Sequence, residues 1–509
     1  MKPTFLVLAA RGEGVASHRD GRGASRARRD DREYREYSRE EQRRPRGCIA
    51  RRMQPGFHHG LLAVVTLAAS MTAQQPPPQQ PPAQPPQPSE IGVTITGEGG
   101  QPPRIAVPDF IALSKDAETV AMAKKMSEVL FDDLMFEHEF SFIPRDVYST
   151  IPAATSLAEI PFDRWRELNA DGLVIGTVEK SGNGFKVDAR LYNVRTRQTT
   201  FGKEYSGTAN ARLYAHHIAD DLHQSQRALR GVARTRLTFT SDRDGQRMSG
   251  TIENRGVKEI YISDYDGENQ RPVTTGRTLN ITPAWSPDAR SIAYTSYRRG
   301  PGNIFISNIF QGTLEEVTRN AGENWLPAWS PDGTKICFSS TRGGTSAQIY
   351  VMNRDGSNVR RLTNDKWINT TPTWSPSGNQ IAFVSDRTGS PQIYIINADG
   401  LGQPTRVTTS EGYADRPSWS PAPYNEIAYT ARTGPGNDIK IIDMVSRQVR
   451  QMTFGEGTNE SPSWAPNGRH FAFMSTRSGK SQIFTVSRTG QDLKQITRAG
   501  NNTQPDWSK

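Results

Sequence analysis

The sequence predicts two folded domains, a small α/β domain followed by an all-β propeller of six four-stranded blades. Three observations lead to this prediction: one motif recurs six times in the second half of the chain, strand signals alone fill each repeat, and a mixed helix and strand pattern precedes the repeats. The 509 residues suffice for two domains or more. The 44 Gly and 34 Pro favour a turn-rich fold over a helical bundle.

Positive charge is concentrated at the start of the chain. Residues 1–52 hold 15 of the 63 Lys and Arg and 8 of the 53 Asp and Glu, and so carry +7 of the net +10. With few apolar residues after Ala10, this stretch is typical of a disordered basic extension, or of a translation start assigned upstream of Met53. The remaining charge of +3 gives no reason to expect a nucleic-acid partner.

An apolar run at Leu61–Ala69 indicates that residues 53–73 form a secretory signal peptide. Its nine apolar-core residues are too short to span a bilayer, so no transmembrane segment is expected. Residues 74–89 are rich in Pro and Gln, which favours an extended linker because proline fixes φ and lacks an N–H donor.

Residues 90–232 are predicted to form the α/β domain. Apolar residues at helical spacing predict a helix over about 117–134, and alternating runs predict strands. The other predicted elements are strands over 91–96, 104–108, 140–143, 172–178 and 185–193, a short helix over 161–168, and a helix over about 214–229.

Residues 233–509 are predicted to form the propeller. A Trp within Pro-x-Trp-Ser-Pro or a close variant recurs at spacings of 44, 45, 45, 45 and 43 residues: Trp285, Trp329, Trp374, Trp419, Trp464 and Trp507. Four-stranded propeller blades are typical of a repeat of this length that contains only strand signals. We expect the six Trp residues to pack between blades, since each occupies one position of a structural unit.

Each repeat has the same internal order. A Ser-Pro-Asp-Gly-like turn such as Ser330–Gly333 precedes an alternating strand, a third strand follows, and a short fourth strand ends in an apolar residue plus Thr. The region begins with a second strand at Leu237 and ends with a first strand at Gln504–Lys509. We therefore expect one blade to contain strands from both ends of the propeller, which closes the ring.

The sequence contains no recognisable catalytic or metal-binding constellation. Gly344–Gln348 lacks the last glycine of a nucleophile elbow, and the adjacent His216 and His217 cannot both face one site on a helix. Two cysteines exclude multi-cysteine metal sites. We therefore expect a protein that is not an enzyme and holds no cofactor or metal.

Two polar positions recur beside one end of the predicted channel. Asn lies three residues before the repeat's Pro in five units, and Arg follows each second strand. In an up-and-down blade these positions fall at the same end, so they would surround one mouth. Repetition favours an architectural role, while recognition stays open. Residues that vary at this mouth are better candidates for selectivity: Trp325, Trp367, Tyr413, Asp415 and Glu460.

The order of these parts resembles the TolB family, the soluble periplasmic component of the Tol–Pal envelope system. Besides the six repeats, the resemblance is carried by Ala106–Phe110, Ala170–Gly176 and Tyr214–Asp220, and it covers about residues 90–509. It implies a non-enzymatic periplasmic adaptor that binds Pal and TolA and supports outer-membrane integrity, invagination during cell division and protein import. The basic start and the proline-rich linker depart from the family pattern.

The resemblance also implies two partner sites. The peptidoglycan-associated lipoprotein Pal would dock at the propeller mouth, for which the candidates are Asn280, Asn324, Trp325, Asn369, Asp415, Asn459, Glu460 and Asn502. The inner-membrane protein TolA would contact the N-terminal strand, with candidates Glu90, Ile91, Val93 and Ile95. This alternating segment suits addition to a partner sheet or a return to its own domain. We expect a monomer, with other outer-membrane proteins as further partners.

Two other functions stay open at this point. Similar propellers occur in prolyl-oligopeptidase-like peptidases, which require an additional hydrolase domain. A periplasmic propeller that senses carbohydrate or peptide, with or without a metal in its channel, is the second alternative.

Overall fold

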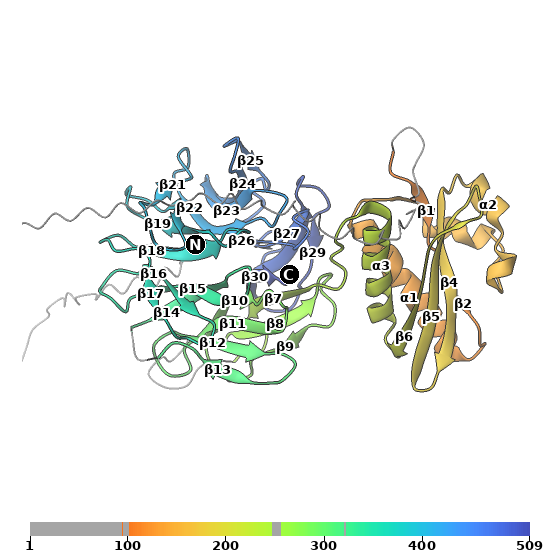
Figure 1. Cartoon of the computed structure of the whole chain (residues 1–509), viewed down its shortest axis with the longest axis horizontal. Helices are drawn as coiled ribbons and strands as arrows, with labels where there is room; N and C mark the ends of the chain where they lie inside the picture. The colour runs from red at the N-terminus through yellow and green to blue at the C-terminus, as the bar shows by residue number, and fades with distance from the viewer. Residues whose placement is uncertain (1–93, 95–100, 247–255, 320–321) are drawn as a thin grey trace, which may run out of the picture. The chain divides into compact units, whose positions relative to one another are not determined.

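The computed structural model describes residues 94, 101–246, 256–319 and 322–509. In this part of the chain, an α/β domain precedes a ring of six four-stranded sheets (Figure 1). The fold class predicted from the sequence is confirmed. The basic extension, the signal peptide, the Pro/Gln linker and the N-terminal candidates Glu90, Ile91, Val93 and Ile95 lie outside the described residues.

One sheet forms the centre of the α/β domain, in the order β3-β1-β4-β5-β6, with β2 also paired to β4. The strands are β1 (Arg104–Ala106), β2 (Ile111–Ala112), β3 (Ser141–Phe142), β4 (Gly172–Ser181), β5 (Gly184–Asn193) and β6 (Thr199–Thr208). The strands predicted over 172–178 and 185–193 are present and longer. Strand β6 was not predicted from the sequence, because this edge strand is mostly exposed and its residues show little apolar alternation.

Helices cover both faces of this sheet. Val174 and Val178 of β4 pack with α1 (Ala117–Phe136) and α3 (Ala211–Arg227). The alternate residues Leu173 and Ile175 pack with Trp165 of α2 (Phe162–Glu167). Two short 3-10 helices, η2 (Arg145–Thr150) and η3 (Leu157–Glu159), precede α2. Because both faces are covered, β4 is a continuous apolar run instead of an alternating one.

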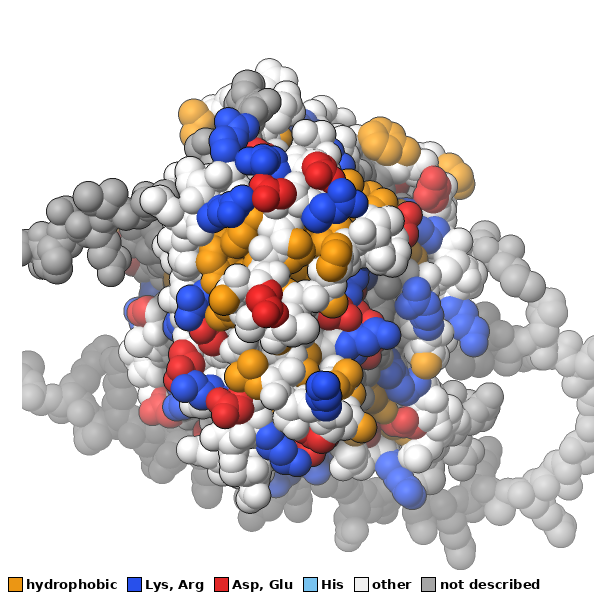
Figure 2. All heavy atoms as spheres, turned by 90° about the vertical axis from the view of Figure 1, so that its right-hand side faces the viewer, with side chains coloured by type: hydrophobic (Ala, Val, Ile, Leu, Met, Phe, Trp, Pro, Cys, Tyr) orange, Lys and Arg blue, Asp and Glu red, His pale blue; other side chains and the backbone are white. Residues whose placement is uncertain are grey.

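Asx caps fix where the two long helices begin. The Asp116 side chain accepts a hydrogen bond from the Thr119 amide at 3.0 Å, and Asn210 accepts one from the Leu213 amide at 3.1 Å. Figure 2 shows basic and acidic side chains interspersed with apolar ones on a face of the molecule. Surface ion pairs in the α/β domain join Asp163 to both Arg166 and Arg197.

The six blades follow in chain order, each an antiparallel sheet. Blade 1 contains β10 (Asn280–Trp285), β11 (Ser291–Ser296), β12 (Asn303–Asn308) and β13 (Leu314–Glu316); blade 2 contains β14 (Asn324–Trp329), β15 (Lys335–Ser340), β16 (Gln348–Asn353) and β17 (Arg360–Arg361); blade 3 contains β18 (Asn369–Trp374), β19 (Gln380–Ser385), β20 (Gln392–Asn397) and β21 (Thr405–Arg406); blade 4 contains β22 (Ala414–Trp419), β23 (Glu426–Thr433), β24 (Gly436–Asp443) and β25 (Val449–Gln451); blade 5 contains β26 (Asn459–Trp464), β27 (His470–Ser475), β28 (Gln482–Ser487) and β29 (Lys494–Gln495).

Blade 6 closes the ring with strands from both ends of the propeller. It has the order β30-β7-β8-β9, with β30 (Asn502–Trp507), β7 (Arg236–Ser241), β8 (Glu259–Asp264) and β9 (Arg271–Pro272). The register pairs Asn502 with Ser241 and Trp507 with Leu237. The predicted mode of closure is therefore confirmed.

The repeated Trp residues pack between neighbouring blades. The indole Nε1 atoms of Trp329, Trp374 and Trp464 each donate to a backbone carbonyl of the preceding blade at 3.1 Å. A large ring that also satisfies its polar atom fills the wedge between two twisted sheets. The other three differ. Trp419 Nε1 donates to the Asn425 side chain of its own blade at 2.9 Å, and Trp507 Nε1 donates to Thr235 Oγ1 at 2.7 Å. Trp285 Nε1 is buried and finds no acceptor among the described residues.

Buried polar groups join the C-terminal part of α1 to blades 5 and 6. Glu137 forms an ion pair with Arg469 and accepts hydrogen bonds from the Val232 amide at 2.8 Å and Asn467 Nδ2 at 3.1 Å. Burial raises the pKa of Glu137 to about 7, although the charge of Arg469 opposes this shift. One buried cluster contains apolar residues of both domains, including Met126 and Phe239.

A second buried group lies nearby on the same helix. Asp133 accepts hydrogen bonds from Tyr265 Oη of blade 6 and from His216 Nδ1 of α3, both at 2.7 Å. Burial disfavours the charged form of His216, but its hydrogen bond to Asp133 and the carboxylate's charge outweigh this and raise the pKa of His216. The α/β domain is thus fixed to the propeller by charged contacts as well as by apolar packing.

Candidate partner-binding mouth of the propeller

The first strands form the inner wall of the propeller, since each is the innermost strand of its sheet and neighbours the first strands of adjacent blades. Each begins with Asn, or Ala414 in blade 4, and ends with Trp. The register pairs Asn369 with Ser385, so the connection between second and third strands lies at the Asn end. We call the Asn end of the ring the mouth and the Trp end the base.

The mouth asparagines join adjacent strands through both ends of their amides. In blade 3, Asn369 Nδ2 donates to Gln348 Oε1 of blade 2 at 3.0 Å, and Arg387 Nη2 donates to Asn369 Oδ1 at 3.1 Å. The same Arg–Asn bond occurs at 2.8–3.0 Å in three other blades, in the pairs Arg243–Asn502, Arg342–Asn324 and Arg477–Asn459. The repeated Asn and Arg residues therefore hold the wall of the mouth together.

This network changes the expected role of the asparagines. Asn280, Asn324, Asn369, Asn459 and Asn502 are all buried, with at most 3 % of their surface exposed. Their polar atoms are used within the wall, so they fix its shape instead of presenting an amide to a partner. Trp325, Asp415 and Glu460, the other three mouth candidates, are half-buried.

Blade 4 departs from the network. Ala414 stands in place of the asparagine, and the guanidinium of Arg432 lies over the Tyr413 ring at 4.9 Å from its centroid. The Tyr413 hydroxyl donates to Asp415 Oδ2 at 3.0 Å. The aromatic and acidic residues predicted at this part of the mouth are therefore brought together by the structure.

A β-bulge occurs at the same place in every first strand. The third residue has a positive φ between 48° and 57° in each case: Thr282, Leu326, Thr371, Arg416, Ser461 and Gln504. The register with the second strand shifts around it. None of the six is glycine, so this conformation is not recognisable from the sequence. Left-handed backbone at such residues is strained and is typical of functional surfaces.

The bulges bond to neighbouring blades. The Leu326 amide donates to Thr295 Oγ1 of blade 1 at 3.2 Å, and the Ser461 amide donates to Thr430 Oγ1 of blade 4 at 3.1 Å. These hydrogen bonds compensate part of the strain and fix the position of the channel-lining residues at these two bulges. The inner wall is therefore preorganised.

The channel lining differs from one side of the mouth to the other. In blades 1 and 2, the second and third residues of the first strands include the apolar Ile281, Trp325 and Leu326. In blades 4 and 5, the same positions contain Asp415, Arg416 and Glu460, all half-buried like their apolar counterparts. One side of the mouth is thus apolar and the other is charged.

The charged side contains a carboxyl group with a perturbed pKa. Glu460 Oε1 accepts a hydrogen bond from Asn437 Nδ2 at 2.6 Å. Burial raises the pKa of Glu460, and the nearby Asp415 adds to this effect, while Asn437 and Arg416 oppose it. A partner cation placed here would gain more than at an exposed carboxylate, because burial reduces the screening by water.

Two exposed aromatic residues extend the mouth outward. Trp367 is 37 % exposed and occupies the position that Gly322, Gly457 and Gly500 take in other blades. At Gly322 a Cβ would lie 2.8 Å from the Arg342 amide nitrogen, so a side chain there requires a different loop path. Phe454 is 75 % exposed and is not among the residues predicted at the mouth. It is the one aromatic residue directly after the repeat's Thr, which was an available signal.

The described residues show no grouping of three or more His, Cys, Asp or Glu side chains arranged to hold a metal ion. The described Cys337 is buried, and burial raises the pKa of its thiol well above the usual range. Within the same residues, no helix combines the length and apolar character needed to cross a membrane.

Comparison with protein families finds two matches along the chain. Residues 227–509 match the TolB beta propeller domain, and residues 91–200 match the TolB amino-terminal domain. Among curated relatives, the Tol-Pal system protein TolB of Desulfosudis oleivorans is 34 % identical over 189 residues, which are 36 % of this chain and 41 % of that protein. The protein of the same name from Geobacter sulfurreducens is 36 % identical over 175 residues, or 34 % of this chain and 38 % of that protein.

The chain therefore spans about two fifths of the length of these curated relatives in the aligned segments. A longer match is found with a solved structure. The crystal structure of TolB from Acinetobacter baumannii superposes with a TM-score of 0.68 at 26 % identity, over 80 % of this chain and 97 % of that one. The similarity thus includes both domains.

Proposed function

The chain belongs to the TolB family, and from this premise we propose that it is a non-enzymatic periplasmic adaptor of the Tol–Pal system. It binds a Pal-like peptidoglycan-associated lipoprotein at the propeller mouth and a TolA-like inner-membrane protein through its N-terminal segment. In this role it supports outer-membrane integrity, invagination of the outer membrane during cell division, and protein import. It reaches the periplasm through the signal peptide expected over residues 53–73.

One observation carries the proposal for the mouth, the division of its lining into an apolar and a charged side. Trp325 and Leu326 provide an apolar surface, and Asp415 and Glu460 provide carboxylates opposite a preorganised wall. Partly exposed Trp and Tyr with adjacent charges are typical of protein interfaces. A partner loop with one apolar residue and one cation would match both sides.

Charge reversal at the acidic side tests this assignment. Asp415→Lys and Glu460→Lys are each expected to weaken binding of the soluble domain of the Pal-like lipoprotein by at least about tenfold, since each replaces attraction by repulsion. The measurement is calorimetric titration, with thermal unfolding as a check on the fold. Asp355→Lys, an exposed position in a turn at the base, is the matched control. Unchanged binding in both mouth variants would place the interface elsewhere.

The N-terminal segment is tested separately. Glu90, Ile91, Val93 and Ile95 stay a prediction, because they lie outside the described residues. A mature chain that begins at residue 97 is expected to lose binding to the TolA-like domain and to retain binding to the Pal-like domain. Loss of binding to both domains would contradict the proposal of two separate binding sites. Retained binding to both domains would show that the N-terminal segment is not the site for the TolA-like protein.

A further inference from the structure

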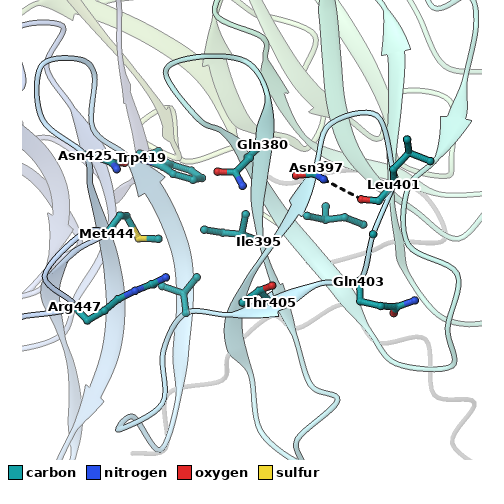
Figure 3. A pocket seen from close by; sticks show the side chains of 13 residues that line it. Gln380, Ile395, Asn397, Leu401, Gln403, Thr405, Trp419, Asn425, Met444 and Arg447 are labelled. Atoms are coloured by element: carbon teal, nitrogen blue, oxygen red, sulfur yellow. Dashed lines mark hydrogen bonds between the residues drawn. The ribbon is translucent and has the colours of Figure 1, made fainter.

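A cavity of about 350 Å³ lies at the base of the propeller between blades 3 and 4 (Figure 3). It lies at the base because Asn397 pairs with Gln380 where the third strand ends, away from the mouth. Trp419, Ile395, Met444 and Arg447 border the same space in Figure 3. None of the mouth residues lines it, so it is separate from the proposed partner site.

The first reason for this cavity is a missing interblade contact. In blades 2 and 4, an arginine of the outermost strand crosses to the next blade: Arg360 Nη2 donates to the Ala398 carbonyl at 2.7 Å, and Arg450 Nη1 donates to the Arg488 carbonyl at 3.1 Å. The register places Thr405 at the equivalent position of blade 3. Its short side chain cannot reach the corresponding residue of blade 4, Met444, so the space between these blades stays open.

The second reason is the different hydrogen bond of Trp419. Trp374 and Trp464 each bond back to the preceding blade, whereas Trp419 Nε1 bonds to Asn425 in its own blade. Asn425 belongs to a connection, 420–425, that is one residue longer than the corresponding 375–379. The short side chain of Thr405 and the hydrogen bond of Trp419 within its own blade therefore meet at this junction and leave it open.

The lining determines which ligand chemistry fits. Arg447 is the one ionisable side chain among the lining residues, and none of the described carboxylates forms an ion pair with it. Gln380, Asn397 and Gln403 add amide groups. Ile395, Val407, Met444 and the Trp419 ring provide an apolar wall. A guanidinium without a carboxylate partner, beside amide donors, favours an anion with planar oxygens.

We propose that this cavity binds a carboxylate joined to an apolar body, with the carboxylate paired to Arg447 and the body packed against Trp419 and Met444. Its volume is within the range of small-molecule sites, roughly 300–1,000 Å³. Two sources share this chemistry, a free small acid and the carboxyl-terminal residue of a peptide. The site goes beyond the proposed adaptor function, because it lies at the other end of the ring.

The first test compares N-acetyl-leucine with its uncharged amide by calorimetric titration into the mature protein. The acid is expected to saturate below about 10 mM and the amide to bind at least about tenfold more weakly, since a charge-assisted hydrogen bond is lost. Equal binding of the two probes, or no binding of either up to about 10 mM, would overturn the proposal.

Two variants and a control locate the binding. Arg447→Gln is expected to weaken binding of the acid about tenfold and to leave the amide unchanged. Thr405→Arg introduces an arginine at the position that Arg360 and Arg450 occupy in blades 2 and 4. This side chain is expected to fill the cavity and to abolish binding of both probes. Lys480→Gln removes an exposed cation at the mouth end of blade 5 and is expected to change nothing. If Thr405→Arg does not fold, Arg447→Gln decides, and an unchanged affinity for the acid in that variant contradicts the proposal.

The peptide Ala-Ala-Leu distinguishes the two sources. If its free carboxyl form binds at least about tenfold more tightly than N-acetyl-leucine, and its amidated form does not, the natural ligand is a peptide carboxyl terminus. Equal affinity of the free peptide and N-acetyl-leucine assigns the site to a small acid. Both results support the carboxylate chemistry, whereas tighter binding of the amidated peptide contradicts it.

Discussion

The mouth and the base of the propeller are built from the same repeat, yet they use it differently. At the mouth, buried Asn–Arg bonds recur in four blades and hold a wall whose inner residues vary. At the base, Trp residues fill the wedges between blades, and the α/β domain is anchored on blades 5 and 6 through Glu137 and Asp133. Residues that recur around the ring thus form the architecture at both ends. Residues that differ from the repeat line the proposed partner site and the cavity at the base.

The two ends also differ in what their buried polar groups connect. The mouth network consists of amide–guanidinium bonds that recur around the ring, joined in two blades by the buried carboxylates Glu259 and Asp438. At the base, the buried carboxylates Glu137 and Asp133 bond across the contact between the α/β domain and the propeller. Substitutions at the base are therefore expected to cost more stability than substitutions at the mouth, and substitutions of exposed mouth residues are expected to affect binding alone.

The largest effect is expected for Arg469→Ala at the base. This change leaves the buried carboxylate of Glu137 without its cation, which costs about 3–5 kcal/mol of unfolding free energy. Denaturant unfolding followed by circular dichroism measures the loss. Lys180→Ala is the matched control, because it removes the exposed ion pair with Glu118 and is expected to leave the unfolding midpoint unchanged. A small effect of Arg469→Ala would show that the Glu137–Arg469 ion pair adds little to the attachment of the α/β domain.

The next effect depends on pH and concerns Asp506 of blade 6. Burial raises its pKa from 3.8 to about 6, although it accepts hydrogen bonds from the Trp285 amide at 2.7 Å and Ser463 Oγ at 3.0 Å. A raised native pKa means that the folded state binds the proton more tightly, so stability falls as pH rises from 3.8 to about 6.

Relative to Asp506→Asn, the wild-type protein is therefore expected to lose about 1 kcal/mol per pH unit over this interval. Unfolding free energies of both proteins, measured at several pH values, give the difference. A difference that is independent of pH would show that Asp506 is ionised at no extra cost.

A smaller loss is expected for Asn369→Ala at the mouth. The change leaves Gln348 and Arg387 without their shared partner in a buried wall, which costs about 2 kcal/mol. Thr370→Ala, the neighbouring residue on the half-buried inner wall, is expected to stay within about 0.5 kcal/mol of wild type. Equal effects of the two substitutions would show that the amide network adds nothing to stability.

The smallest effect on stability is expected for Phe454→Ser, since this side chain is 75 % exposed. Its unfolding free energy should change by less than about 0.5 kcal/mol, while affinity for the Pal-like domain falls by at least about tenfold. Val445→Ser, 82 % exposed at a turn of the base, serves as the control and should leave both quantities unchanged. Loss of binding in the Val445→Ser control would show that the base also takes part in binding the Pal-like domain, which contradicts a site confined to the mouth.

Much of the fold was predictable because the repeat is regular. The period of the Trp residues fixed the number of blades, and the incomplete first and last repeats fixed the closure by β30 and β7. In the α/β domain, α1, α3, β4 and β5 followed from periodicity, whereas the exposed edge strand β6 did not. At the mouth, Trp325, Asp415 and Glu460 were recognisable as departures from the repeat, and Phe454 is an equally visible departure that was not predicted.

The sequence by itself determined the architecture, because apolar alternation and turn residues act over a few neighbours and repeat along the chain. The tertiary structure alone decided the rest. None of the six bulges has a glycine at its positive φ, and in three of them the bulge amide donates to a side chain of a neighbouring blade. The burial of the mouth asparagines, the pairing of Glu137 with Arg469 and the cavity beside Thr405 each depend on residues far apart in sequence. Only the closed ring and the docked domain place those residues within reach of one another.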